Sequence, residues 1–161
     1  MERTLRYDAS GNFSKAEPLH QKALKIYEEK LGPDDDKVAY TLHHLAEIHR
    51  ISGRYTSSEK FYKRAIEIWI KNHGSDYSEL ALVLNNFALL YEAQKCFGKA
   101  VPLRKHSIAV LQKSMGPLDP SISIAFTDLA NLYEAMGMRT EAEQCRQKAN
   151  NAQVQMQQSR P

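Results

Sequence analysis

Histidine and aspartate side chains gather in one stretch of this 161-residue sequence and are the first candidates for a metal site. His43, His44 and His49 form the densest histidine group, but His43 and His49 are six positions apart and project from different sides of a helix. The run Asp34–Asp36 lacks the alternating acids and the glycine of a calcium-binding loop. Both groups therefore favour structural roles, ring packing for His49 and helix capping for the aspartates.

No catalytic or cofactor-binding motif is found in the sequence. It contains no glycine-rich phosphate loop, no nucleophile elbow and no His-Glu-x-x-His helix. Neither Cys96 nor Cys145 has a second cysteine nearby, so we expect reduced thiols rather than a disulfide framework or a metal-binding pair. The sequence predicts a noncatalytic protein with no cofactor and no metal, in which Cys96 lies exposed in a turn.

The composition is that of one folded domain. Hydrophobic residues make up 42% and charged residues 25%, and the net charge of +3 is too small to indicate nucleic acid by itself. The longest apolar run, Leu80–Leu84, is far shorter than the roughly 20 residues that cross a bilayer, and Met1–Ser10 is too polar for a secretion signal. We expect a soluble, cytoplasmic protein.

The glycines are spaced with a regular step of 21 residues. Glycine readily adopts the left-handed conformation that ends a helix, so this ladder predicts a series of helix ends with helices of about 17 residues, or about 25 Å, between them. Lys95 takes the one missing position, where we expect a cost of about 1 kcal/mol and an irregular turn. The ladder consists of Gly11, Gly32, Gly53, Gly74, Gly116 and Gly137.

Two kinds of connection alternate along the ladder, which makes the repeat period 42 residues. The stretches 33–36, 75–78 and 117–120 are rich in Asp, Ser and Pro, the residues that cap and start helices. The other connections are tight turns, as at Gly53–Tyr55. This alternation predicts antiparallel helical hairpins joined in series.

Apolar residues recur at the i, i+3, i+4 and i+7 positions of one face of each predicted helix. Small residues, such as Ala46 opposite Ser58 and Ala65, stand where two helix backbones have to pack closely. The pattern predicts an all-α fold. On the first helices of the hairpins the apolar face consists of Leu42, Leu45, Ala46 and His49, then Leu84, Phe87, Ala88 and Tyr91, then Phe126, Leu129, Ala130 and Tyr133.

Two segments, Leu84–Tyr91 and Lys22–Gly32, carry a family resemblance. They resemble tetratricopeptide repeats of the 42-residue variety, the type found in kinesin light chains and in nephrocystin-3-like adaptors. The resemblance implies an α-α superhelix, a solenoid of helical hairpins that forms a single repeat domain. Its parts are a half repeat (11–35) and the repeats 36–77, 78–119 and 120–150, preceded by the remnant of a first helix (1–10) and followed by a polar tail (151–161).

The resemblance also implies where a partner binds, because the first helices of such repeats line a concave groove that holds peptides. Asn85 and Asn86 match the paired asparagines of the family motif, whose amides both donate to and accept from an extended peptide backbone. The expected groove residues are Tyr40, His43, His44, Glu47, Arg50, Leu82, Asn85, Asn86, Leu89, Glu92, Ile124, Thr127, Asp128, Asn131 and Glu134.

The charge of the predicted helices indicates what such a groove would hold. The first helices (36–52, 78–94, 120–136) sum to −4, and the second helices (14–30, 55–72, 97–114, 139–156) sum to +8. An acidic groove disfavours acidic cargo peptides and the C-terminal carboxylates of chaperones. We therefore expect a basic or amphipathic partner segment, with apolar anchors against Leu82, Leu89 and Ile124.

The resemblance places such an adaptor or scaffold in a cytoskeletal, motor-cargo or ciliary assembly. Two alternatives remain open from the sequence. The basic second helices could bind RNA, which a steep salt dependence would reveal. The uncovered N-terminal helix could instead form a structural homo-oligomer, which a concentration-dependent mass in solution would reveal.

Overall fold

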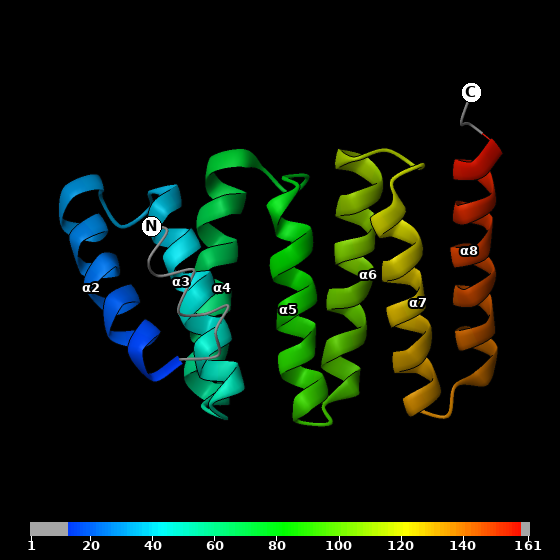
Figure 1. Cartoon of the computed structure of the whole chain (residues 1–161), viewed down its shortest axis with the longest axis horizontal. Coiled ribbons are helices and arrows are strands. Elements are labelled where there is room, and N and C mark those ends of the chain that lie inside the picture. Colours follow the sequence, from blue (N-terminus) through cyan, green and yellow to red (C-terminus); the bar gives the residue numbers. More distant parts are fainter. Residues whose placement is uncertain (1–12, 159–161) are drawn as a thin grey trace. The chain divides into compact units, whose positions relative to one another are not determined.

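Helices make up most of the described part of the chain, which the computed structural model covers from residue 13 to residue 158, with side chains from Ala16 onward. They are α2 (Phe13–Leu31), α3 (Asp36–Ile51), α4 (Tyr55–His73), α5 (Glu79–Ala93), α6 (Phe97–Ser114), α7 (Pro120–Ala135) and α8 (Arg139–Gln158) (Figure 1). No strand occurs between residues 13 and 158, and the predicted all-α class is confirmed. The predicted helix remnant at 1–10, and Gly11, lie outside the described residues.

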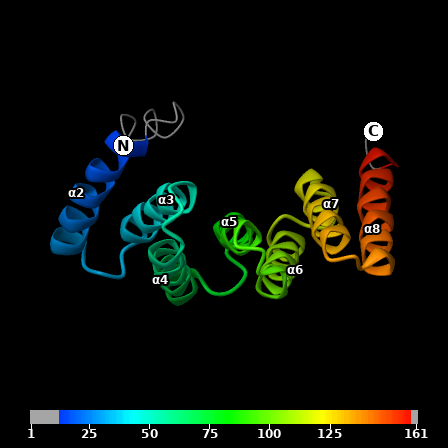
Figure 2. The ribbon, with the colours of Figure 1, turned by 90° about the horizontal axis from the view of Figure 1, so that it is seen from below.

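The chain forms two compact units, a first unit of residues Met1–Gly74 and a second unit of Ser75–Pro161. Helices α2, α3 and α4 belong to the first unit and α5 to α8 to the second, and consecutive helices pack on each other within each unit. In the second unit, α7 lies between α6 and α8 in both views (Figures 1 and 2). The first helices of the predicted hairpins are α3, α5 and α7, and the second helices are α2, α4, α6 and α8.

The long connections start helices largely as their composition predicts. The carboxylates of Asp35 and Asp119 each accept a hydrogen bond of 2.8 Å from the backbone N–H two residues further on, which caps α3 and α7. Pro120 occupies the first turn of α7, where no backbone N–H is needed. Ser78 differs, because its side chain makes no capping bond and its hydroxyl donates to Glu79 instead.

The three short turns share one hydrogen-bond pattern, including the turn that lacks a glycine. Gly53 and Gly137 have φ angles of 73° and 75°, and Lys95 has a φ of 57°. The residue after each of them donates its N–H to a carbonyl near the end of the preceding helix, at 2.8, 2.8 and 2.9 Å in chain order. The prediction of an irregular turn at Lys95 is therefore wrong, because the same hydrogen bonds hold the lysine in the left-handed conformation of the glycine it replaces.

Replacing Lys95 with glycine is expected to stabilise the second unit by about 1 kcal/mol, because glycine adopts a positive φ without a Cβ penalty. The Lys95 side chain is exposed, so little contact is lost. The urea midpoint followed by circular dichroism measures the gain. In the matched control Ala109→Gly, at an exposed helical position of α6, the midpoint should fall instead. A lower midpoint for Lys95→Gly would contradict the strain inferred at this turn.

A buried serine joins the two helices of each hairpin. The Ser58 hydroxyl donates to the backbone carbonyl of Ala46 at 2.7 Å and so connects α4 to α3. The corresponding pairs are Ser107 with Ala81 (α6 to α5, 2.7 Å) and Ser123 with Ala149 (α7 to α8, 3.0 Å). Small side chains stand where the backbones approach closely, as expected for Ala46 and Ser58.

The predicted apolar face of the first helices forms the core. All of its positions are buried except Phe126, which is half-buried. Trp69 is 1% exposed and packs edge-on against Tyr40, with 5.0 Å between ring centroids, so it serves packing as expected. Helix α8 continues to Gln158, into the predicted polar tail. Within residues 13–158, no helix has the length and apolar character needed to cross a membrane.

Candidate functional site

An apolar pocket of about 360 Å³ opens in the second unit between α5, α6 and α7, hereafter the α5–α7 pocket. Leu82 of α5 and Ile124 of α7 line it, and they remain 57% and 62% exposed. Exposed apolar side chains that gather in a hollow mark a surface that can bind a partner. The lining residues are Ser78, Ala81, Leu82, Asn85, Ser107, Leu111, Met115, Asp119, Ser121, Ile124, Ala125 and Asp128.

A buried arginine on α6 connects two polar side chains of this pocket, Asn85 and Asp128, to Glu92 of α5. Arg104 is 5% exposed. Its Nε donates to Glu92 Oε1 at 2.9 Å, and its Nη1 donates to Asp128 Oδ2 at 2.8 Å and to Asn85 Oδ1. A guanidinium can satisfy several acceptors at once because it carries five N–H donors in one plane. Arg104 therefore holds together α5, α6 and α7, the three helices that form the pocket.

These contacts fix the orientation of the Asn85 amide. Because its Oδ1 accepts from Arg104, its Nδ2 group is the end that remains to donate to a ligand. Asp128 uses Oδ2 for Arg104, and its other oxygen can accept from a ligand N–H or cation. The predicted groove residues Leu82, Asn85, Ile124 and Asp128 thus lie together in one pocket.

The predicted groove residues of the first unit are more buried than expected. His43 is only 8% exposed and its ring packs beside those of Tyr62 and Trp69, with 6.2 Å between the centroids in each pair. Burial, with a smaller contribution from neighbouring His44, lowers the pKa of His43 to about 4. The expectation that His43 faces a partner is corrected, because the turn it occupies packs against α4.

The other predicted residues of the first unit are half-buried and engaged within the unit. His44 stacks between His20 and His43, at centroid distances of 5.0 and 5.7 Å. Glu47 forms an ion pair of 2.9 Å with Arg50 and accepts a hydrogen bond from the Tyr62 hydroxyl. Tyr40 packs on Trp69. Within the part of the chain that the structure describes, no group of three histidine, cysteine or acidic side chains could hold a metal ion.

The remaining predicted residues differ in exposure. Asn86, Leu89 and Glu92 on α5 are half-buried. Thr127, Asn131 and Glu134 on α7 are exposed, and Glu134 pairs with Arg146 of α8. Neither these α7 residues nor Asn86 and Leu89 line the α5–α7 pocket, so the structure gathers only part of the predicted set into one site.

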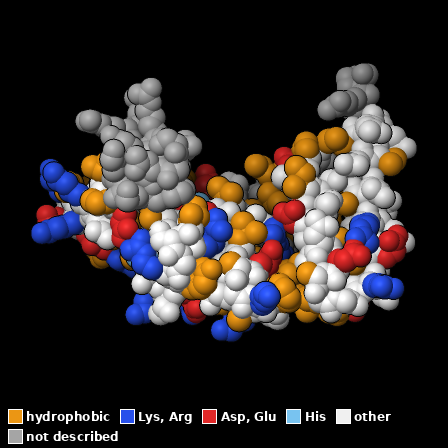
Figure 3. Space-filling model, turned by 60° about the horizontal axis from the view of Figure 1, so that its bottom comes forward, with side chains coloured by type: hydrophobic (Ala, Val, Ile, Leu, Met, Phe, Trp, Pro, Cys, Tyr) orange, Lys and Arg blue, Asp and Glu red, His pale blue; other side chains and the backbone are white. Residues whose placement is uncertain are grey.

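Each acidic residue of the predicted groove has a basic partner in its own unit. Glu47 pairs with Arg50, Glu134 with Arg146, and Glu92 and Asp128 share Arg104. On the face drawn in Figure 3, acidic and basic side chains lie intermixed. The helix charge sums of −4 and +8 therefore overstate the charge that a ligand would meet.

Sequence reasoning missed the role of Arg104. This residue occupies the repeat position held by His20 and Tyr62, which are also buried. A charged residue at a buried repeat position needs a counter-charge nearby, so the arginine at this position could have indicated a buried ion pair. It pointed to the acidic residues of the neighbouring first helices, but not to which of them would pair.

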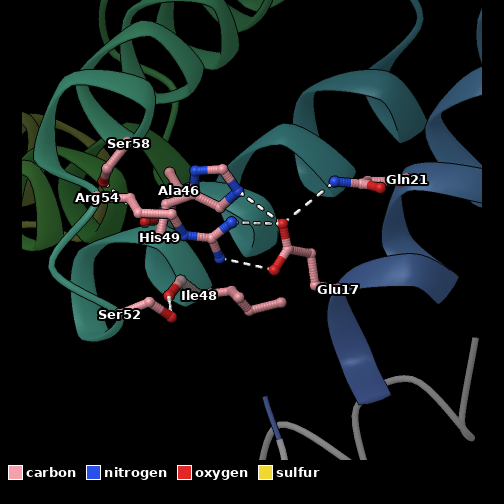
Figure 4. A network of polar contacts seen from close by, with 8 residues as sticks. All are labelled: Glu17, Gln21, Ala46, Ile48, His49, Ser52, Arg54 and Ser58. Carbon is pink, nitrogen blue, oxygen red and sulfur yellow. Dashed lines mark hydrogen bonds and ion pairs between the residues drawn. The ribbon is translucent and has the colours of Figure 1, made fainter. Parts of the chain in front are cut away.

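A second polar network, in the first unit, joins α2 to the hairpin formed by α3 and α4 (Figure 4). Arg54 donates from both Nη atoms to the Glu17 carboxylate, at 2.7 and 2.6 Å, and His49 Nε2 lies 3.1 Å from Glu17 Oε1. The hydrogen bonds from Arg54 lower the pKa of Glu17, and burial lowers the pKa of His49. His49 is 6% exposed, as expected for a core ring.

The comparison with protein families finds matches along most of the chain. The family model described as tetratricopeptide repeat matches residues 7–71, 37–103 and 79–151. The three matched ranges overlap and together cover every described helix except the end of α8. No curated protein sequence matches the chain.

Solved structures share the fold. The crystal structure of BtubC (BKLC) from P. vanneervenii has a TM-score of 0.87 at 28% identity and covers 98% of this chain, but the chain spans only 63% of that protein. A putative kinesin light chain of Podospora anserina with nearly identical TPR-like repeats has a TM-score of 0.83 at 21% identity, covering 96% of this chain and 73% of that one. MamA has a TM-score of 0.58 at 17% identity and covers 98% of both chains. The last two identities show a common fold alone.

Proposed function

Because this chain belongs to the tetratricopeptide repeat family, we propose that it is a noncatalytic protein-interaction module that holds a segment of a partner protein in the α5–α7 pocket. One observation carries the proposal. Leu82 and Ile124 stand exposed beside the Asn85 amide, which the buried Arg104 orients. Apolar anchors beside a fixed backbone donor are the elements of peptide recognition in a groove.

The ligand is an amphipathic segment with basic residues beside its apolar anchor. Asp119 and Asp128 line the pocket, and Glu92 shares Arg104 with Asp128. Within the described residues, Arg104 is the one basic side chain that forms an ion pair with any of these three carboxylates. Negative charge is therefore in excess even after pairing. Lysine or arginine in the ligand finds complementary charge there, and an acidic segment is disfavoured.

A peptide-display selection against the whole chain tests this assignment. We expect the enriched peptides to combine a large apolar side chain with Lys or Arg. Leu82→Asp and Ile124→Asp should each weaken binding of a selected peptide by about tenfold or more, measured by fluorescence anisotropy. Both positions are exposed, so the fold should be unaffected, whereas reversing the charge of Glu92 would also disturb Arg104.

Val154→Asp is the matched control, because Val154 is 48% exposed on α8 and does not line the pocket. Its affinity for the selected peptide should equal that of the parent protein. Enrichment of acidic peptides, or equal affinity in the Leu82 and Ile124 variants, would rule out the α5–α7 pocket as the binding site.

We place this module as an adaptor or scaffold in a cytoplasmic assembly linked to the cytoskeleton. The support for this context is the structural likeness to BtubC (BKLC) and to the putative kinesin light chain. We extend the proposal to a motor-cargo setting through the likeness to the putative kinesin light chain, and to a ciliary setting through the sequence resemblance to nephrocystin-3-like adaptors. Localisation of the tagged protein with and without depolymerised filaments tests the context separately from the pocket.

A further inference from the structure

A second hollow in the second unit shares no lining residue with the α5–α7 pocket. It has a volume of about 320 Å³, and α6 and α8 form its two walls. Helix α7, which lies between these two helices (Figure 2), also contributes lining residues. Each wall is one helical face: positions 105, 108, 109 and 112 of α6, and 141, 144, 145 and 148 of α8, both spaced i, i+3, i+4 and i+7. We name it the α6–α8 cleft.

Two lysines stand over aromatic rings of α7 in this cleft. The ammonium of Lys105 lies 5.7 Å from the centroid of the Tyr133 ring, and that of Lys148 lies 5.7 Å from the centroid of the Phe126 ring. A cation over a ring face is held in place without being neutralised. The side-chain hydrogen bond with Tyr133 raises the pKa of Lys105, so this group stays charged at neutral pH.

These lysines differ from basic residues elsewhere on the second helices. Lys71, Lys113 and Arg146 each form an ion pair with a carboxylate of their own unit. Neither Lys105 nor Lys148 is within ion-pair distance of any carboxylate among the described residues, so their charge remains to attract an anionic ligand.

The rest of the lining indicates the other features of the ligand. Glu141 is the one acidic side chain of the lining, and it attracts Lys105 from a longer range, which leaves Lys148 as the stronger anion-attracting end. The half-buried Phe126 offers apolar surface. Gln112 and Gln144 add exposed amides, which can donate to and accept from a peptide backbone.

We propose that the α6–α8 cleft is a second protein-docking site, which takes an acidic peptide segment whose apolar side chain enters between the helices while its carboxylates meet Lys105 and Lys148. It is independent of the basic or amphipathic ligand proposed for the α5–α7 pocket. The two sites would let one unit hold two segments of opposite charge.

The probe is a short fluorescein-labelled peptide of Glu and Asp with one central tryptophan, and the same peptide with Lys in place of its acids is the comparison. We expect the intact chain to bind the acidic probe and not the basic one. Lys105→Glu and Lys148→Glu should each weaken binding by about tenfold, and Glu141→Gln should strengthen it, since it removes the opposing charge.

Two variants separate docking in the cleft from general attraction to basic helices. Lys99→Glu is the matched control, because Lys99 lies on α6 with its ammonium 5.1 Å from the centroid of the Tyr91 ring, outside the cleft. It should bind the probe as the parent does. Ala109→Trp fills the cleft from an exposed position without altering charge and should abolish binding. Circular dichroism and thermal midpoints verify that each variant is folded.

Cys145 gives a readout that does not depend on the label. It lines the cleft and is 7% exposed, whereas Cys96 is exposed and does not line the cleft. A saturating concentration of the probe should slow the modification of Cys145 by iodoacetamide and leave the rate of modification of Cys96 unchanged, as measured by mass spectrometry. Protection of neither thiol would overturn the placement of the probe in the cleft.

Several results would overturn the proposal. Equal losses in Lys99→Glu and Lys148→Glu would show unspecific charge attraction, and binding by Ala109→Trp would show that the cleft is not entered. Binding of a uridine oligonucleotide in preference to the acidic peptide, lost in the same lysine variants, would assign the surface to RNA instead. Loss of binding in Leu82→Asp would move the peptide to the α5–α7 pocket, so the two proposals fail separately.

Discussion

Acidification from pH 7 to pH 4 should destabilise the first unit by about 3 kcal/mol through His43 alone. Its pKa is about 4 in the folded protein and 6.5 in the unfolded chain, because the ring is buried beside His44. Above pH 6.5 both states hold the neutral ring and nothing is lost. Between pH 6.5 and pH 4 only the unfolded state binds the proton, so stability falls through this window and the loss levels off below it.

Urea unfolding at a series of pH values, followed by the fluorescence of Trp69, measures this slope in the first unit, since the chain has a single tryptophan. His43→Gln should remove most of the slope, while His106→Gln, at an exposed position of α6, should keep it. A smaller slope should remain in His43→Gln, because burial also lowers the pKa of His49. An unchanged slope in His43→Gln would contradict the burial of its neutral ring.

Arg104→Met should destabilise the second unit by about 3 kcal/mol, the low end of the range for breaking a buried ion pair. The low end applies because Glu92 and Asp128 keep 24% and 38% of their side chains exposed, so water can solvate the carboxylates left behind. The reason for the loss is that two carboxylates and the Asn85 amide oxygen lose their shared donor at the contact of α5, α6 and α7. Chemical unfolding followed by circular dichroism measures it.

Arg146→Met is the matched control, since Arg146 makes a single exposed ion pair with Glu134 and its loss should cost less than about 1 kcal/mol. Adding Glu92→Gln and Asp128→Asn to Arg104→Met should restore much of the stability, because no unpaired charge is then left. If Arg104→Met and Arg146→Met unfold at the same midpoint, the three-helix role of Arg104 is wrong.

The fold followed from the sequence because helix ends are local signals. A positive φ at Gly53, Gly74 or Gly137 depends on the residue itself, so the 21-residue step placed every described helix to within a few residues. The regular turn at Lys95 was not predicted, because the intrinsic backbone preference of lysine does not include the hydrogen bonds that its neighbours contribute. These bonds depend on the helices on both sides of the turn.

The candidate site was harder to predict because it depends on several helices together. Spacing placed Leu82 and Asn85 on one face of the same helix, since the periodicity of a single helix fixes its faces, and the structure brings this face of α5 beside Ile124 of α7. Spacing could not show that α4 covers His43, or that Arg104 reaches two first helices, because both facts depend on how far apart the helices pack. The α6–α8 cleft was missed for the same reason, as its lining comes from three helices.

The serine hydroxyls inside the hairpins limit how this protein can deform. Shifting α6 along α5 by one turn would separate the Ser107 hydroxyl from the Ala81 carbonyl and leave this buried hydroxyl without its acceptor, at a cost of about 1 to 3 kcal/mol. Ser123 opposes the same motion of α8 along α7. Each helical hairpin should therefore move as a rigid body. Mechanical load on the second unit should bend the connecting segment 115–119 before the two helices of either hairpin slide past each other.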